Sequence, residues 1–171
     1  QAFTHRSISS KPRGNYERLE FLGDAVIDII ISRELMRYYP DGDEGLLTKK
    51  RSALVQQSFL SKIGNMLNIM DYLIVEPNVD LNNEKVVNKQ QANLVEALVG
   101  ALYLDGGIKP AKTVIKNTIW KYRNEAWKTI NYKGQLIEYC HANGINNPKF
   151  HVVNVSGPDH QKTFEIHVSI N

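Results

Sequence analysis

Four acidic side chains recur at helical spacing near the start of the chain. Glu17, Glu20, Asp24 and Asp28 follow one another at intervals of three, four and four residues. At about 100° per residue of an α-helix, these four carboxylates occupy a sector of roughly 80°. Carboxylates crowded on one face repel one another, and a divalent cation is the simplest partner that relieves the repulsion. Oxygen ligands of this kind suit Mg²⁺ or Mn²⁺.

The residues around these acids are mostly apolar. A helix that is apolar nearly all round is usually buried, so we expect a buried helix from about residue 16 to residue 39, ended by Pro40. An acidic stripe on a solvated helix is the alternative interpretation. The apolar residues that fill the opposite face or border the acids are Leu19, Phe21, Leu22, Ala25, Val26, Ile27, Ile29, Ile30 and Ile31.

A second segment carries polar residues at a similar spacing. Lys89, Asn93, Glu96 and Gly100 are separated by four, three and four residues. The apolar pattern predicts a helix from about residue 86 to residue 104, closed by two glycines at 106 and 107. Glycine inside a helix costs about 1 kcal/mol relative to alanine, so Gly100 indicates the close approach of another backbone.

Both segments carry longer motifs. Residues 15–24 form the run N-x-E-R-L-E-F-L-G-D, and residues 3–7 before it read F-T-H-R-S. This run resembles the signature of the ribonuclease III family, the divalent-metal endonucleases that cut double-stranded RNA. Residues 93–100, N-L-V-E-A-L-V-G, are similar to the family pattern D-x-x-E-A-L-x-G.

The resemblance implies a set of functional residues and partners. It places Glu17 and Glu44 near the metal but outside its ligands, although salt bridges to Arg18 or Arg51 are the alternative role for them. It places Phe21 in a pocket of a partner subunit and so implies a homodimer, although core packing would give the same sequence. Lys49, Lys50, Arg51 and Lys89 are candidates for phosphate contacts. The implied catalytic residues and ligands of Mg²⁺, or of Mn²⁺ as a substitute, are Glu20, Asp24, Asn93 and Glu96.

Asn93 departs from the family pattern, which has aspartate there. An asparagine oxygen can still bind a metal, but it brings no charge. We therefore expect weaker Mg²⁺ occupancy and slower hydrolysis than in a site with four acids. Two other functions stay open: a catalytically inactive double-stranded-RNA-binding or ribosome-associated protein with this fold, and a structural helical dimer. The last would leave the acidic set unexplained.

The composition is that of an ordinary globular protein. The 171 residues are 42% hydrophobic and 23% charged, with a net charge of +3 and a pI near 8.9. This length accommodates one well-packed domain and a smaller one. The single cysteine, Cys140, excludes an internal disulfide framework and favours a reducing, intracellular compartment, cytoplasmic or nuclear. No long apolar run or secretion signal is visible, so we expect no membrane partner.

The pattern changes after residue 130. A short helix is expected at 133–143, followed by strands at 150–155 and 163–170 joined by G-P-D-H at 157–160. This order resembles the first half of a double-stranded-RNA-binding domain, whose RNA contacts would fall on Gln135, Glu138 and His160. We thus expect a mainly α protein: an all-α ribonuclease III endonuclease domain at 1–129, then an incomplete α+β double-stranded-RNA-binding domain at 130–171 that lacks its C-terminal part.

The other elements of the first domain are expected to be helices and loops. Residues 46–68 have a helical pattern with a break near 56–58. Residues 71–85 are expected to form a loop or a short helix, and residues 110–129 a helix that begins at a proline. The basic run at 49–51 is expected to be a solvated face or a phosphate contact.

Overall fold

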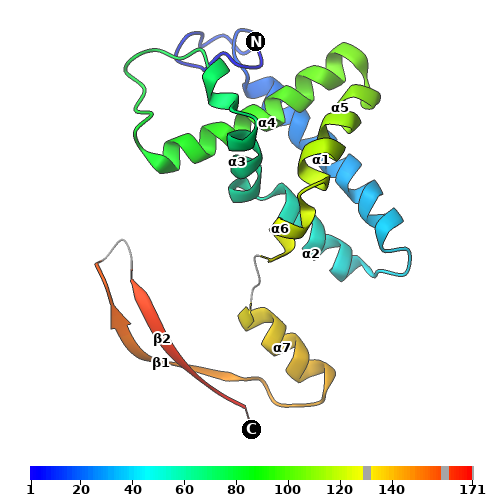
Figure 1. Cartoon of the computed structure of the whole chain (residues 1–171), viewed down its shortest axis with the longest axis vertical. Coiled ribbons are helices and arrows are strands. Elements are labelled where there is room, and N and C mark those ends of the chain that lie inside the picture. Colours follow the sequence, from blue (N-terminus) through cyan, green and yellow to red (C-terminus); the bar gives the residue numbers. More distant parts are fainter. Residues whose placement is uncertain (129–131, 159–161, 171) are drawn as a thin grey trace. The chain divides into compact units, whose positions relative to one another are not determined.

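The computed structural model describes residues 1–128, 132–158 and 162–170. The chain forms two compact units, residues 1–129 and residues 130–171, and each is described by itself (Figure 1).

The first unit is built from helices, as expected. Apart from an isolated bridge between Thr4 and Ile74, its described regular structure is helical throughout. Its elements are α1 (Glu17–Tyr38), α2 (Glu44–Val55), α3 (Gln57–Met66), η1 (Ile69–Tyr72), α4 (Glu84–Gly106), α5 (Ile108–Ile115), η2 (Lys116–Trp120) and α6 (Arg123–Lys128). The expected break in the 46–68 segment is confirmed, because Gln56 is extended between α2 and α3.

Helices α1 and α4 pack against each other at two glycines. A Cβ atom at Gly23 would overlap the carbonyl of Glu96, and one at Gly100 would overlap the carbonyl of Leu19. The close backbone approach expected from Gly100 is therefore confirmed. Because a side chain at either position would separate the helices, glycine fixes how near and in what register they pack.

Helix α1 is buried on one side only, so the expected all-round burial is wrong for this chain by itself. Ile27 and Ile31 are fully enclosed, but Ile29 is 64% exposed and Phe21 is 81% exposed. Ala25 is exposed as well. The reason is geometric: α4 and the neighbouring helices cover a single side of α1. The apolar composition of α1 indicates that its surface is to be buried, and the other helices of the first unit bury only part of that surface.

The expected helix at 110–129 is interrupted. After α5, residues Lys116–Trp120 form a π-helical turn, and α6 begins at Arg123. The wider turn carries Trp120, whose ring packs edge-on against Tyr38 at a centroid distance of 5.7 Å. Packing against α1 thus accompanies the local departure from α-helical geometry.

An aromatic cluster joins α6 to α1 and α2. The rings of Trp120 and Trp127 meet edge-on at 6.2 Å, and the guanidinium of Arg123 lies 5.0 Å from the rings of both Tyr38 and Trp120. Lys50 Nζ lies 4.5 Å from the centre of the Trp127 ring, whose Nε1 donates a hydrogen bond of 3.2 Å to the Lys50 carbonyl. Lys50 therefore supports this cluster and is not simply a solvated charge.

The second unit contains a helix and an antiparallel strand pair. They are α7 (Tyr132–Ala142), β1 (Lys149–Ser156) and β2 (Thr163–Ser169), with Phe150 opposite Val168 and an irregular register between Val152 and Asn154. Gly144, at φ +66°, follows the helix in a left-handed conformation that suits glycine. Cys140 is buried. Positions 135 and 138 fall on α7, and His160 lies outside the residues that the structure describes.

None of the helices that the structure describes is both long and apolar enough to cross a bilayer.

Candidate active site

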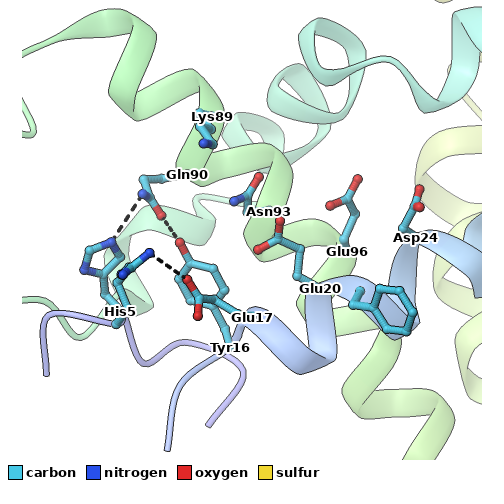
Figure 2. Close-up of a pocket in the computed structure, with 11 residues that line it drawn as sticks. His5, Tyr16, Glu17, Glu20, Asp24, Lys89, Gln90, Asn93 and Glu96 are labelled. Carbon is cyan, nitrogen blue, oxygen red and sulfur yellow. Dashed lines mark hydrogen bonds and ion pairs between the residues drawn. The ribbon is translucent and has the colours of Figure 1, made fainter. Parts of the chain in front are cut away.

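A pocket of about 630 Å³ opens where α1 crosses α4 (Figure 2). It brings together, from two helices, all four residues that the sequence indicates as metal ligands. The residues that line it are His5, Arg6, Tyr16, Glu17, Glu20, Phe21, Asp24, Lys89, Gln90, Asn93 and Glu96.

The glycine contacts explain why the four residues meet. Gly23 lies between Glu20 and Asp24 in the sequence, and it rests against the carbonyl of Glu96. Gly100 lies one turn beyond Glu96 on α4. The close crossing of the two backbones therefore places the acids of α1 opposite the polar side of α4.

Burial and mutual repulsion shape the electrostatics of the pocket. Burial, followed by the charges of Asp24 and Glu20, raises the pKa of Glu96 to about 8. Burial and the Glu17 charge raise the pKa of Glu20, while Lys89 and hydrogen bonding with Asn93 oppose that rise. Burial and the Asp28 charge raise the pKa of Asp24. Near neutral pH the carboxylates therefore do not all ionise unless positive charge is added.

The donor chemistry fits a hard divalent cation. Three carboxylate side chains and one amide side chain line one pocket, and carboxylate and amide oxygens are ligand types that Mg²⁺ or Mn²⁺ accepts. Among the described residues, no group of three or more His, Cys, Asp or Glu side chains forms a ready-made metal site. Uncompensated carboxylates repel one another, so side-chain rotation would have to accompany binding of an ion.

The two other predicted glutamates lie in different surroundings. Glu17 lines the pocket, and its carboxylate pairs with Arg6 at 3.3 Å. Glu44 instead lines a neighbouring hollow of about 420 Å³ that also contains Arg51. The fourth acid of the stripe, Asp28, is not among the residues that line the main pocket, and it pairs with Arg51 at 3.7 Å.

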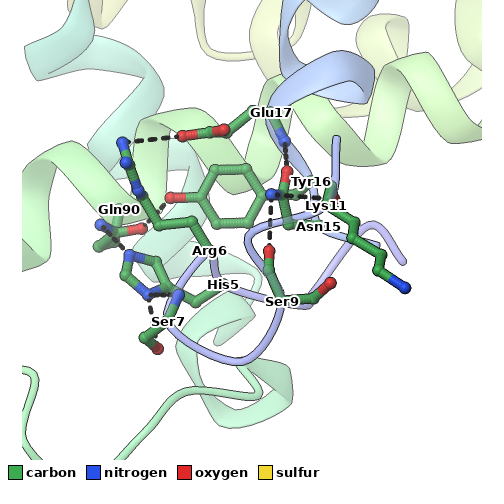
Figure 3. A network of polar contacts seen from close by, with 9 residues as sticks. All are labelled: His5, Arg6, Ser7, Ser9, Lys11, Asn15, Tyr16, Glu17 and Gln90. Carbon is green, nitrogen blue, oxygen red and sulfur yellow. Dashed lines mark hydrogen bonds and ion pairs between the residues drawn. The ribbon is translucent and has the colours of Figure 1, made fainter. Parts of the chain in front are cut away.

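Sequence reasoning missed a buried polar network beside the pocket (Figure 3). The Tyr16 hydroxyl donates a 2.5 Å hydrogen bond to Gln90 Oε1, and Gln90 Nε2 lies 3.5 Å from His5 Nε2. His5 Nδ1 in turn lies 2.9 Å from Ser7 Oγ. Two signals were available: Tyr16 lies inside the N-x-E motif, and Gln90 lies one turn before Asn93 on the same helix face.

Comparison with protein families gives two matches along the chain. Residues 1–122 match the model described as Ribonuclease-III-like, and residues 132–171 match the double-stranded RNA binding motif. Ribonuclease 3 of Ehrlichia ruminantium (strain Welgevonden) is 38% identical over 100% of this chain and 77% of that protein. Ribonuclease 3 of Chlorobaculum tepidum is 36% identical over 99% of this chain and 66% of that protein.

Solved structures agree on the fold of the first unit. The nuclease domain of ribonuclease III from Campylobacter jejuni aligns with a TM-score of 0.64 at 38% identity, covering 70% of this chain and 82% of that one. That structure is described as showing flexibility in a region involved in dimer formation. Dicer from Pichia stipitis aligns with a TM-score of 0.51 at 23% identity over 90% of this chain and 75% of that one, which supports the fold alone.

The helical fold, the pocket of carboxylates and the RNA-binding motif define a nuclease with an appended RNA-binding module. The chain belongs to the ribonuclease III family of endoribonucleases.

Proposed function

We propose that this protein is a divalent-metal-dependent endoribonuclease that cleaves double-stranded RNA as a homodimer. Residues 1–129 would form the endonuclease domain, and residues 130–171 the first part of a double-stranded-RNA-binding domain. The observation that supports the proposal most is the pocket in which Glu20 and Asp24 of α1 face Asn93 and Glu96 of α4.

The side chains of the pocket would have separate roles in phosphodiester hydrolysis. A bound Mg²⁺, or Mn²⁺ as a substitute, would supply charge neutralisation at phosphate and an acidified water. Glu20, Asp24 and Glu96 would hold the ion, and Asn93 would add a neutral oxygen. Lys89 also lines the pocket, and its charge would attract the phosphate backbone.

Asn93 is expected to limit the rate. A neutral ligand leaves the ion less tightly held and the developing charge on phosphorus less well stabilised than an aspartate would. Asn93→Asp should therefore raise cleavage by about 10²–10³-fold, the size of a typical preorganised electrostatic contribution. The measurement is a cleavage time course on labelled double-stranded RNA across Mg²⁺ and Mn²⁺ titrations, with Glu96→Gln as the inactive control.

The result separates the proposal from its alternative. If the Asn93→Asp protein is no faster at any metal concentration, position 93 is not a ligand that matters. If neither form cuts while both bind double-stranded RNA, the chain is a catalytically inactive RNA-binding relative. The neutral side chain of Asn93 favours this alternative.

Dimerisation is supported by the surface of α1. Phe21 is 81% exposed at the rim of the pocket, and Ile29 and Met36 are 64% and 63% exposed on the same side of the helix. One copy offers one pocket, which serves one strand of a duplex. A two-fold dimer would supply the second pocket and cover the exposed apolar side chains.

The second unit supports RNA as the substrate. Domains of its matched type recognise duplex RNA by shape and by 2′-hydroxyl contacts across the shallow minor groove. We propose that Gln135 and Glu138 on α7, together with His160, make such contacts. Fluorescence polarisation with matched RNA and DNA duplexes tests this: RNA should bind at least tenfold more tightly, and equal affinities would contradict it.

A further inference from the structure

The network behind the pocket reaches one of the proposed ligands. Gln90 and Asn93 lie three residues apart on α4, so they project from the same side of the helix. Tyr16 is 3% exposed, and its hydroxyl ends at Gln90 Oε1, 2.5 Å away, beside Asn93 (Figure 2). Burial and the Glu20 charge raise the pKa of Tyr16, and hydrogen bonding with Asn93 and Gln90 opposes the rise.

Proton counting limits which way a hydrogen bond between Tyr16 and Asn93 can run. A hydroxyl has one proton, and that of Tyr16 is donated to the oxygen of Gln90. The Tyr16 oxygen can then only accept from Asn93, and an ionised Glu20 carboxylate can likewise only accept. The two protons of the Asn93 amide nitrogen match these two acceptors. Figure 2 shows the Asn93 nitrogen on the side of Tyr16.

We propose that Tyr16 is a positioning residue: its hydroxyl, fixed by Gln90, holds the amide nitrogen of Asn93 so that the amide oxygen is presented to the pocket. This inference rests on the proposed metal-dependent function. It also makes the network specific to asparagine, because an aspartate has no proton to donate. With Asn93→Asp, the Tyr16 hydroxyl could satisfy that carboxylate or Gln90, but not both.

The alternative is that Tyr16 serves packing alone. Its ring lies 5.9 Å from the ring of His5, and its backbone N–H donates to the Thr4 carbonyl at 3.0 Å. Tyr16→Phe keeps the ring and the backbone bond and removes only the hydroxyl. A residue that only packs would therefore lose stability on this change without altering how the pocket binds a metal.

The first test is Mn²⁺ binding to the full chain without RNA, followed by the electron paramagnetic resonance signal of free Mn²⁺. Tyr16→Phe should weaken binding by about 10-fold, and the nearly isosteric Gln90→Met should shift it in the same direction. Tyr72→Phe, at a tyrosine that is 63% exposed, is the matched control and should change nothing. Unchanged Mn²⁺ affinity in folded Tyr16→Phe protein would overturn the inference.

The second test needs no metal. Thermal unfolding midpoints are measured in EDTA for the wild type, Tyr16→Phe, Asn93→Ala and the double variant. If Tyr16 holds Asn93, the double variant should lose clearly less than the sum of the two single shifts. Additive shifts would overturn the inference. A wild type that neither binds Mn²⁺ nor cuts RNA would refute the proposed function instead, and this cycle would still decide whether Tyr16 holds Asn93.

Discussion

Both sides of α1 carry large apolar side chains, but their surroundings are opposite. Ile27 and Ile31 are 1% and 0% exposed against α4 and its neighbours, whereas Ile29, between them in the sequence, is 64% exposed. On a helical projection the exposed set of Phe21, Ile29 and Met36 falls within roughly 80°, and the acids lie along one border of the buried side. Hydrophobicity thus indicates that both sides require a cover, and only the structure shows that this chain supplies one of them.

The largest effect is expected where the buried side meets α4. Gly100→Ala places a Cβ on the carbonyl of Leu19, so the helices must move apart. We expect a loss of about 4 kcal/mol in unfolding free energy or no stable fold. Chemical denaturation measures it, with Gly45→Ala as control because a Cβ there meets no neighbour closer than 3.6 Å. Equal stability of the two variants would show that the crossing tolerates a side chain.

Replacing isoleucine by alanine at two positions of α1, one buried and one exposed, tests the difference between its two sides. Ile31→Ala removes a fully buried side chain and should cost about 3 kcal/mol in unfolding free energy. Ile29→Ala removes an exposed one and should cost less than about 0.5 kcal/mol in dilute protein.

The dependence of these two stability costs on protein concentration tests whether a second copy covers Ile29. If the exposed side is covered by a second copy, the cost of Ile29→Ala should grow as concentration rises through the dimer range, whereas the cost of Ile31→Ala should not. A cost for Ile29→Ala that is large at every concentration would mean that the side chain is buried within one chain.

Phe21 tests what covers the exposed side. Its ring has almost no contact within one chain, so Phe21→Ala should leave the monomer fold intact and weaken self-association by about 2 kcal/mol, near 30-fold in Kd. Sedimentation equilibrium across a dilution series gives the dimer constant. Ala25→Ser, a small change on the same exposed side, is the control. An unchanged dimer constant for Phe21→Ala would remove the ring from the interface.

The pocket beside the acidic border of α1 carries a smaller expected effect, a pH dependence. The pKa of Glu96 is about 8 in the folded chain against an ordinary value of 4.5, so the folded state binds the extra proton between these values. Without metal, stability should therefore fall as pH rises from about 4.5 to about 8, by about 1 kcal/mol after solvent screening.

Glu96→Gln should flatten that slope, and saturating Mn²⁺ should oppose it by favouring the ionised form. Denaturant midpoints from pH 5 to pH 8.5 in EDTA measure the effect. A Glu96→Gln protein with the same slope as the wild type would assign the pH dependence to other groups.

Local patterns predicted what depends on neighbouring residues in the chain. The spacing of Glu20 and Asp24 placed them on one helix face, Gly100 predicted the crossing, and the Gln56 region predicted a break. The network from Tyr16 to Gln90 escaped prediction because it joins residues 74 positions apart. The sequence could not tell which of Ile29 and Ile31 is buried, because both have the same side chain. Their burial differs only because the other helices pack against one side of α1.

The aromatic cluster at the end of the first unit has a practical consequence. The chain has two tryptophans, Trp120 and Trp127, and both belong to that cluster. Residues 130–171 contain tyrosine and phenylalanine but no tryptophan. Emission excited at 295 nm therefore reports the first unit alone. A quenched or red-shifted spectrum would record release of α6 from α1, while far-ultraviolet circular dichroism would follow both units together. Comparing the two signals during denaturation shows whether the nuclease unit and the RNA-binding unit melt as one or in turn.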